Sequence, residues 1–189
     1  VAIVQLVSHP SLDQIVSGIY EGLEDQGYVE GDNLTVDFNN AQGDINLLNQ
    51  IAEGVVNNNP DIIFAVTTPV AQSFQHLTSE IPIIMVGVTD PFAAGLVENM
   101  ENPEANITGA SDLAPIEAQF DLLVKLLPEA KSVGMIYTTS EDNSLADVEA
   151  AKKLAEERGL EFIVEGISAS LDMQLVAENL VPKVDVIYI

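Results

Sequence analysis

Apolar residues fall into short runs along the chain, and each run is followed by a segment with a different period. Runs such as "VAIVQLV" and "IIFAV" are typical of strands that are buried on both faces. Between them, apolar residues recur every three or four positions, as in helices that cover a core. The predicted strands are 1–7, 33–38, 61–66, 81–88, 106–111, 132–137, 161–166 and 184–189. The predicted helices are 11–26, 44–58, a short one from Pro69, 115–127, 144–158 and 170–180.

This alternation predicts an α/β fold with parallel sheets and covering helices. The series also repeats itself, because the acid-rich turns "EDQG" (24–27) and "EERG" (156–159) each close a helix that follows a strand and a polar loop. We therefore predict two Rossmann-like lobes, residues 1–110 and 111–189, divided near "GASDLAP". The second lobe contains only three predicted strands, so we expect it to be incomplete.

Local signals mark the predicted helix ends. Ser11 with Gln14 has the spacing of a capping box and predicts the start of the first helix. Thr68 followed by Pro69 predicts another start, with the proline at the first helical position.

Composition and charge exclude several classes of protein. Hydrophobic residues make up 47% of the chain, enough for a sizeable core. Six Lys plus Arg stand against 30 Asp plus Glu, a net charge of −24, which argues against nucleic acid and anionic membrane surfaces as partners. No cysteine is present, so disulfides and thiol chemistry are excluded. The chain begins and ends inside predicted strands, and we expect it to be an excerpt of a longer protein.

Catalytic motifs are not found. The sequence contains no Walker A motif, no G-x-G-x-x-G after a strand, no G-x-S-x-G and no H-E-x-x-H. Two histidines are too few for a convincing metal site in a chain without cysteine. We predict a protein that is not an enzyme and that uses no cofactor.

Polar loops follow most of the predicted strands. In open parallel sheets, ligands bind beyond the carboxyl ends of the strands. Several of these loops lead into helix N-termini, where free N–H groups and the helix dipole favour an anion. Thr67 and Thr68 could thus bind a small carboxylate, although threonine is also an ordinary helix cap and capping alone explains any single loop. Asp112 could pair with a cationic amine, although its position at the division between the lobes also suits a structural role. Asn143 could orient a ligand or simply end its loop.

Four motifs occur together and in order: "AQGD" (41–44), "TDPFAAGLV" (89–97), "NITGASD" (106–112) and "EDNS" (141–144). In these motifs the sequence resembles the solute-binding proteins of ABC importers, and within them the group often called the tryptophan-binding-protein-like family. The resemblance covers essentially the whole chain.

The resemblance implies a type I periplasmic-binding-protein fold whose two lobes close by a hinge on a small ligand. It implies an amino acid as ligand, with aromatic ones favoured, a transporter permease as partner, and an extracytoplasmic location with a signal sequence or lipid anchor ahead of this chain. The residues that it places at the ligand are His9, Gln42, Thr67, Thr68, Pro69, Asp90, Ser111, Asp112, Asn143 and Ser144. A ligand-sensing effector domain of a regulator or signalling receptor is the alternative, because such domains share the two-lobed design.

Overall fold

The computed structural model describes residues 1–103, 105–168 and 170–189. It divides into two compact units, Val1–Leu113 and Ala114–Ile189. The sequence places the division three residues earlier. The difference arises because strand β5 (Ile107–Ser111) belongs to the first sheet and the N–H of Asp112 donates to the carbonyl of Val88 at 3.0 Å.

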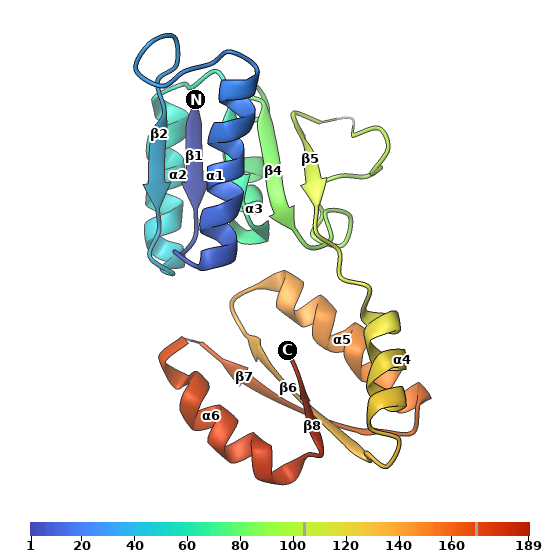
Figure 1. Cartoon of the computed structure of the whole chain (residues 1–189). Helices are drawn as coiled ribbons and strands as arrows, with labels where there is room; N and C mark the ends of the chain where they lie inside the picture. Colours follow the sequence, from blue (N-terminus) through green and yellow to red (C-terminus); the bar gives the residue numbers. More distant parts are fainter. Residues whose placement is uncertain (104, 169) are drawn as a thin grey trace. The chain divides into compact units, whose positions relative to one another are not determined.

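The first unit contains a five-stranded parallel sheet in the order β2-β1-β3-β4-β5 (Figure 1). The other strands are β1 (Ala2–Gln5), β2 (Asp37–Asn40), β3 (Ile63–Val66) and β4 (Ile83–Val88). The helices are α1 (Pro10–Asp25), α2 (Ile45–Asn57) and α3 (Thr68–Leu77).

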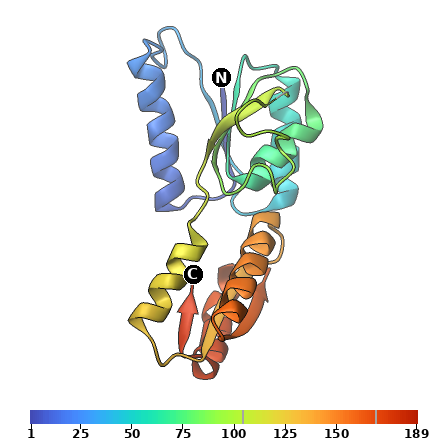
Figure 2. The same cartoon turned by 90° about the vertical axis from the view of Figure 1, so that its right-hand side faces the viewer.

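Both faces of this sheet are covered: α1 lies on one face, and α2 and α3 lie on the other (Figure 2). Because side chains alternate along a strand, Val4 packs in the cluster that contains Leu48 and Phe74, whereas Ile3 packs in the cluster of Ile19 on α1. All four residues of β1 are buried, which explains why its sequence is an apolar run with little alternation.

The second predicted strand, residues 33–38, was wrong in its bounds. Asn33 instead closes a loop: its Oδ1 accepts the N–H of Val29 at 2.7 Å, and its Nδ2 donates to the carbonyl of Gly27 at 2.8 Å. These bonds hold the backbone in a compact turn, so the strand begins only at Asp37.

Two predicted helix starts were also wrong. The cap of α1 is His9, whose Nδ1 accepts the N–H of Ser11 at 3.3 Å, and Ser11 lies inside the helix because Pro10 begins it. In α3 the first residue is Thr68, so Pro69 occupies the second helical position.

The second unit has three parallel strands in the order β7-β6-β8, which reproduces the order β2-β1-β3 of the first unit. Its elements are α4 (Ile116–Leu126), β6 (Ser132–Thr138), α5 (Asp142–Glu157), β7 (Glu161–Ile167), α6 (Met173–Leu180) and β8 (Val186–Tyr188). The predicted helix 170–180 is divided, with a 3-10 turn at Ser170–Asp172 ahead of α6.

Its core is small but has two sides. Phe120 of α4 and Ala151 of α5 are fully buried in one cluster with Val133 of β6. Leu180 of α6 lies on the other side, where a Cβ on Gly134 would meet it at 3.0 Å. The sheet is therefore covered on both faces, as in the first unit.

Candidate functional site

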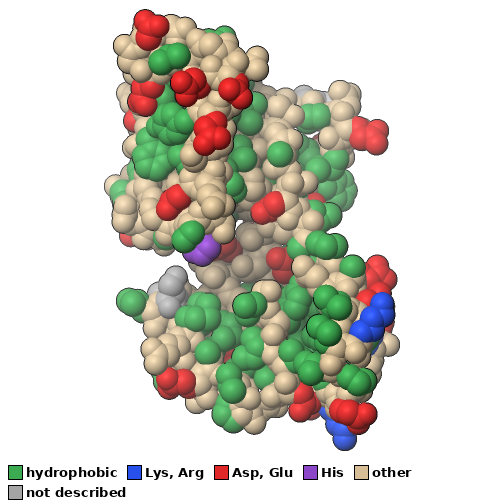
Figure 3. Space-filling view, in the orientation of Figure 1, with side chains coloured by type: hydrophobic (Ala, Val, Ile, Leu, Met, Phe, Trp, Pro, Cys, Tyr) green, Lys and Arg blue, Asp and Glu red, His purple; other side chains and the backbone are tan. Residues whose placement is uncertain are grey.

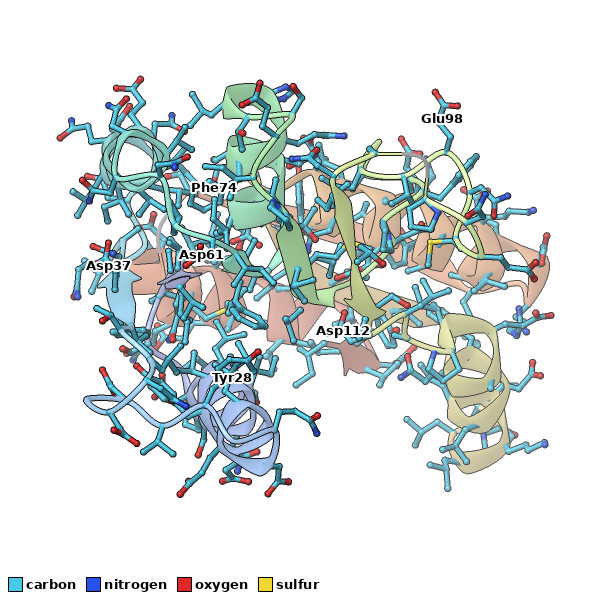
Figure 4. The ribbon with its side chains drawn as sticks, turned by 90° about the horizontal axis from the view of Figure 1, so that it is seen from above. Tyr28, Asp37, Asp61, Phe74, Glu98 and Asp112 are labelled. Atoms are coloured by element: carbon cyan, nitrogen blue, oxygen red, sulfur yellow. The ribbon has the colours of Figure 1, made fainter. Side chains whose placement is uncertain are left out.

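The carboxyl ends of the strands of the first unit form one edge of its sheet. The register pairs Gln5 of β1 with Asn40 of β2 and with Val66 of β3, so the loops that follow these three strands are neighbours. Asp37 and Asp61 lie at the opposite edge, because Asp37 begins β2 and Asp61 precedes β3 (Figure 4). Only the carboxyl edge carries the predicted site residues of this unit.

Thr67 connects β3 to α3 in a strained conformation. Its φ of 85° and ψ of 161° fall in a region that is almost restricted to glycine, and a β-branched residue there is a genuine outlier. The surrounding backbone holds it in place: its N–H donates to the carbonyl of Val86 at 3.0 Å, and its carbonyl accepts the N–H of Ala71 at 3.1 Å.

The hydroxyl groups of Thr67 and Thr68 do not cap the helix. Thr67 occupies the N-cap position, but its side chain makes no capping hydrogen bond. The Oγ1 atoms of both threonines are buried and have no partner, and Thr68 is only 1% exposed. The capping interpretation of these hydroxyls is therefore wrong, and two buried polar groups are left with free hydrogen-bonding capacity.

These two hydroxyls belong to a small set. In the part of the chain that the structure describes, four buried side-chain atoms lack a hydrogen-bond partner, namely Gln5 Oε1, Thr67 Oγ1, Thr68 Oγ1 and Asn143 Oδ1. Gln5 ends β1 and the two threonines follow β3 in the first unit, whereas Asn143 lies in the first turn of α5 in the second unit. Since buried polar groups are normally satisfied, the unpartnered atoms at the carboxyl edge of the first sheet mark this edge as a candidate binding site.

Gln42 and His9 belong to neighbouring loops of the first unit. Gln42 has a φ of 57°, and its N–H donates to Asn40 Oδ1 at 2.8 Å. Asn40 in turn donates to Ser8 Oγ at 3.0 Å, beside His9. These bonds connect the β2–α2 loop with the β1–α1 loop, and the side chains of Gln42 and His9 remain exposed.

Asp90 shapes the loop that follows β4. Its Oδ1 accepts the N–H groups of Phe92 and Ala93 at 3.0 and 2.9 Å, so this carboxylate oxygen has a structural role. Phe92, an exposed aromatic residue on the same loop, is 63% exposed. Ser111 and Asp112 are exposed at the end of β5 and belong to the first unit, not to the second lobe where the sequence placed them (Figure 4).

The second unit presents Glu141, Asn143 and Ser144 after β6. Asn143 and Ser144 lie in the first turn of α5, which begins at Asp142, two residues before the predicted start. Burial raises the pKa of Glu141, which occupies the N-cap position without capping the helix. Glu141 is the first residue of the "EDNS" motif but is not among the site residues predicted from the sequence.

Charge is distributed unevenly between the units. All six Lys and Arg residues lie in residues 114–189, whereas residues 1–113 contain 16 Asp plus Glu and neither basic type. In Figure 3, correspondingly, the visible Lys and Arg side chains all belong to the second unit.

Among the described residues, no group of three or more His, Asp or Glu could hold a metal ion. No described helix is long and apolar enough to cross a membrane.

Comparison with known proteins identifies the family. A family model for ABC transporter substrate-binding proteins matches residues 1–189. The chain belongs to this family. Its α/β architecture with parallel sheets is that of the type I periplasmic binding proteins, as the resemblance in the sequence implied.

Individual relatives support the assignment. The chain is 43% identical over 189 residues to a tyrosine-binding protein of Clostridioides difficile, covering all of this chain and 55% of the relative. A conserved domain protein from Vibrio cholerae has a TM-score of 0.96 at 39% identity, and a domain from Streptococcus pneumonia in complex with L-Trp has 0.92 at 36%. These matches cover 99% and 98% of this chain and 63% of each solved chain. The chain thus spans a little over half the length of these relatives.

Proposed function

We propose that this protein is the extracytoplasmic solute-binding component of an ABC importer and that it binds an amino acid, with aromatic side chains favoured. The observation that carries the proposal is the pair of buried, unpartnered hydroxyls of Thr67 and Thr68 at the N-terminus of α3. A ligand carboxylate placed there would accept hydrogen bonds from both hydroxyls and from free N–H groups of the first helical turn.

The charge of the first unit supports a zwitterion over a simple anion. With 16 acidic residues and no Lys or Arg, residues 1–113 repel a molecule that carries only negative charge. A free amino acid has no net charge, because its ammonium group balances its carboxylate. The helix N-terminus can then bind the carboxylate while the acidic surroundings favour the ammonium group.

The preference for an aromatic side chain rests on the relatives. One is named for tyrosine and another was solved with L-Trp, at 43% and 36% identity. The family assignment supports the two other parts of the proposal, a transporter permease as partner and an extracytoplasmic location. Both concern the whole protein, of which this chain spans a little over half.

The test is a Thr68→Val variant titrated with L-tyrosine and L-tryptophan by calorimetry. Valine has nearly the same shape as threonine, so the variant removes only a buried hydroxyl that has no partner in the unliganded protein. We expect the melting temperature to stay the same or to rise, since that hydroxyl is not satisfied in the fold. We expect the affinity to fall about 10- to 100-fold, the usual effect of losing a hydrogen bond to a charged group.

Thr78 provides a matched control at the other end of the same helix. Its Oγ1 accepts the N–H groups of Glu80 and Ile81, both at 3.2 Å, so its hydroxyl is used by the fold. Thr78→Val should lower the melting temperature and leave the affinity unchanged. A Thr68→Val protein that binds as tightly as the wild type would refute the carboxylate site, and a wild type that binds neither amino acid would refute the ligand class.

A further inference from the structure

Gln5 is a polar residue at a core position. It ends β1, is 0% exposed, and faces the same side of the sheet as Ile3, which packs against α1. An apolar side chain would fill this position without the cost of burying an amide. The residue therefore has a use beyond filling the core.

The amide of Gln5 holds together the segment that connects β1 to α1. Its Nε2 donates to the carbonyl of Val7 at 2.6 Å and to Oδ1 of Asp13 at 2.8 Å. These two bonds use both donors of the amide, so its orientation is determined and Oε1 is an acceptor. That Oε1 is buried and has no partner, which a residue serving only the fold would avoid.

The bonds of Gln5 act on the part of the site that carries His9. Asp13 lies in α1, and its N–H donates to the carbonyl of His9 at 2.8 Å. Gln5 thus fixes the loop at Val7 on one side of His9 and the helix at Asp13 on the other. From the neighbouring loop, the N–H of Gly43 donates to the carbonyl of Leu6 at 2.8 Å, which connects the same segment to Gln42.

We propose that Gln5 is a positioning residue for ligand binding: its amide holds the β1–α1 loop, and with it His9, in the binding conformation. The proposal rests on the ligand site proposed above. Binding is tighter when the contacting loop is already ordered, because less conformational entropy is lost. In this proposal Gln5 acts through the loop, by way of the two bonds that its Nε2 donates.

The test compares Gln5→Met with Ile3→Met. Methionine fills the volume of either residue and makes no strong hydrogen bond, and Ile3 lies on the same strand and face. For Gln5→Met we expect affinity for L-tyrosine to fall about tenfold, with a melting temperature equal to or above that of the wild type, because an unsatisfied buried acceptor is removed along with the two bonds. For Ile3→Met we expect unchanged affinity.

A double-mutant cycle then tests the route through Asp13. Asp13→Ala removes the helix partner of Gln5, and we expect it to weaken binding by itself. Combined with Gln5→Met it should cause little further loss, since both changes release the same loop. Two fully additive losses would contradict the proposed route.

Hydrogen exchange separates this proposal from that of the ligand. In the unliganded protein, Gln5→Met should increase amide exchange about tenfold over residues 7–13, while Ile3→Met should not. Unchanged exchange, unchanged affinity, or a parallel fall of affinity and melting temperature would each overturn the positioning role. If the wild type does not bind L-tyrosine, the proposed ligand is wrong, and the exchange data still decide whether Gln5 holds the loop.

Discussion

The strained backbone at Thr67 leads us to predict that glycine stabilises this position relative to alanine, the opposite of the usual order. At most positions, replacing alanine by glycine costs about 0.5–1 kcal/mol, because glycine loses more backbone freedom on folding. Thr67, with φ 85° and ψ 161°, lies where a residue with a Cβ pays about 1–3 kcal/mol of strain. Glycine avoids this strain, so the middles of the two ranges favour Thr67→Gly over Thr67→Ala by about 1 kcal/mol. In a chain of 189 residues, a change of about 1 kcal/mol shifts the melting temperature by about 2–4 °C.

The assay is urea denaturation of the wild type, Thr67→Gly and Thr67→Ala, followed by circular dichroism. Both variants lack the hydroxyl, so the difference between their free energies of unfolding reports the backbone strain at residue 67. Thr67→Gly should unfold at a higher urea concentration than Thr67→Ala, with the same slope. Both should bind L-tyrosine about tenfold or more weakly, because the proposed carboxylate site loses a donor. If the alanine variant is as stable as the glycine variant, the strain argument is wrong.

Three further predictions concern stability. A Cβ on Gly109 would lie 1.9 Å from the carbonyl oxygen of Met85, so Gly109→Ala should destabilise the β4–β5 pairing by about 2–4 kcal/mol, measured by urea titration. Gly18→Ala in α1 is the control and should not be destabilising, because a Cβ there meets open space. Hydrogen bonds from Lys131 N–H and Ser132 hold the pKa of Asp185 below its ordinary 3.8. The stability that the Asp185 carboxylate adds to the fold is therefore complete above pH 3.8 and is lost as the pH falls through the lowered pKa. Asp185→Ala should have a lower melting temperature than the wild type at pH 7, and its melting temperature should fall less on acidification. Salt should raise the melting temperature, because it screens the repulsion within a chain of net charge −24, and a fall between 0.05 and 0.5 M NaCl, roughly a threefold change in Debye length, would contradict this.

Much of the fold could be predicted from the hydrophobic pattern. Buried parallel strands must be apolar on both faces, and each predicted strand that is centrally placed, such as β1 or β6, lies where the pattern put it. The edge strand β2 was placed too early, because the preceding turn depends on the side chain of Asn33 bonding to Val29 and Gly27. A single side-chain hydrogen bond does not change the periodic pattern of apolar residues, so the pattern cannot predict this turn. The predicted start of α1 was wrong for a similar reason, because a nitrogen of His9 caps the helix where a serine cap was expected.

The candidate site could be located from the sequence but not understood from it. Thr67 and Thr68 were expected at the carboxyl end of β3 because a polar pair followed by proline interrupts an apolar run. The sequence could not show that their hydroxyls lack hydrogen-bond partners. The conformation of Thr67 depends on backbone hydrogen bonds to Val86 on another strand and to Ala71 one turn along the helix. Gln5 gave no signal either. A single polar residue in an apolar run has many explanations until its neighbours are known.

The strain and the unsatisfied polar atoms lie where the core can best support them. β1 and β3 are central strands, each paired on both sides, and Val4, Ala65 and Val66 are completely buried. A conformation that costs a few kcal/mol persists only where its surroundings leave the backbone no cheaper alternative. The same rigidity keeps the hydroxyls of Thr67 and Thr68 available, because a mobile loop would turn them toward water or toward its own backbone. In the proposed site, the core of the first unit therefore contributes to binding, because it holds the two hydroxyls unsatisfied until a ligand carboxylate accepts their hydrogen bonds.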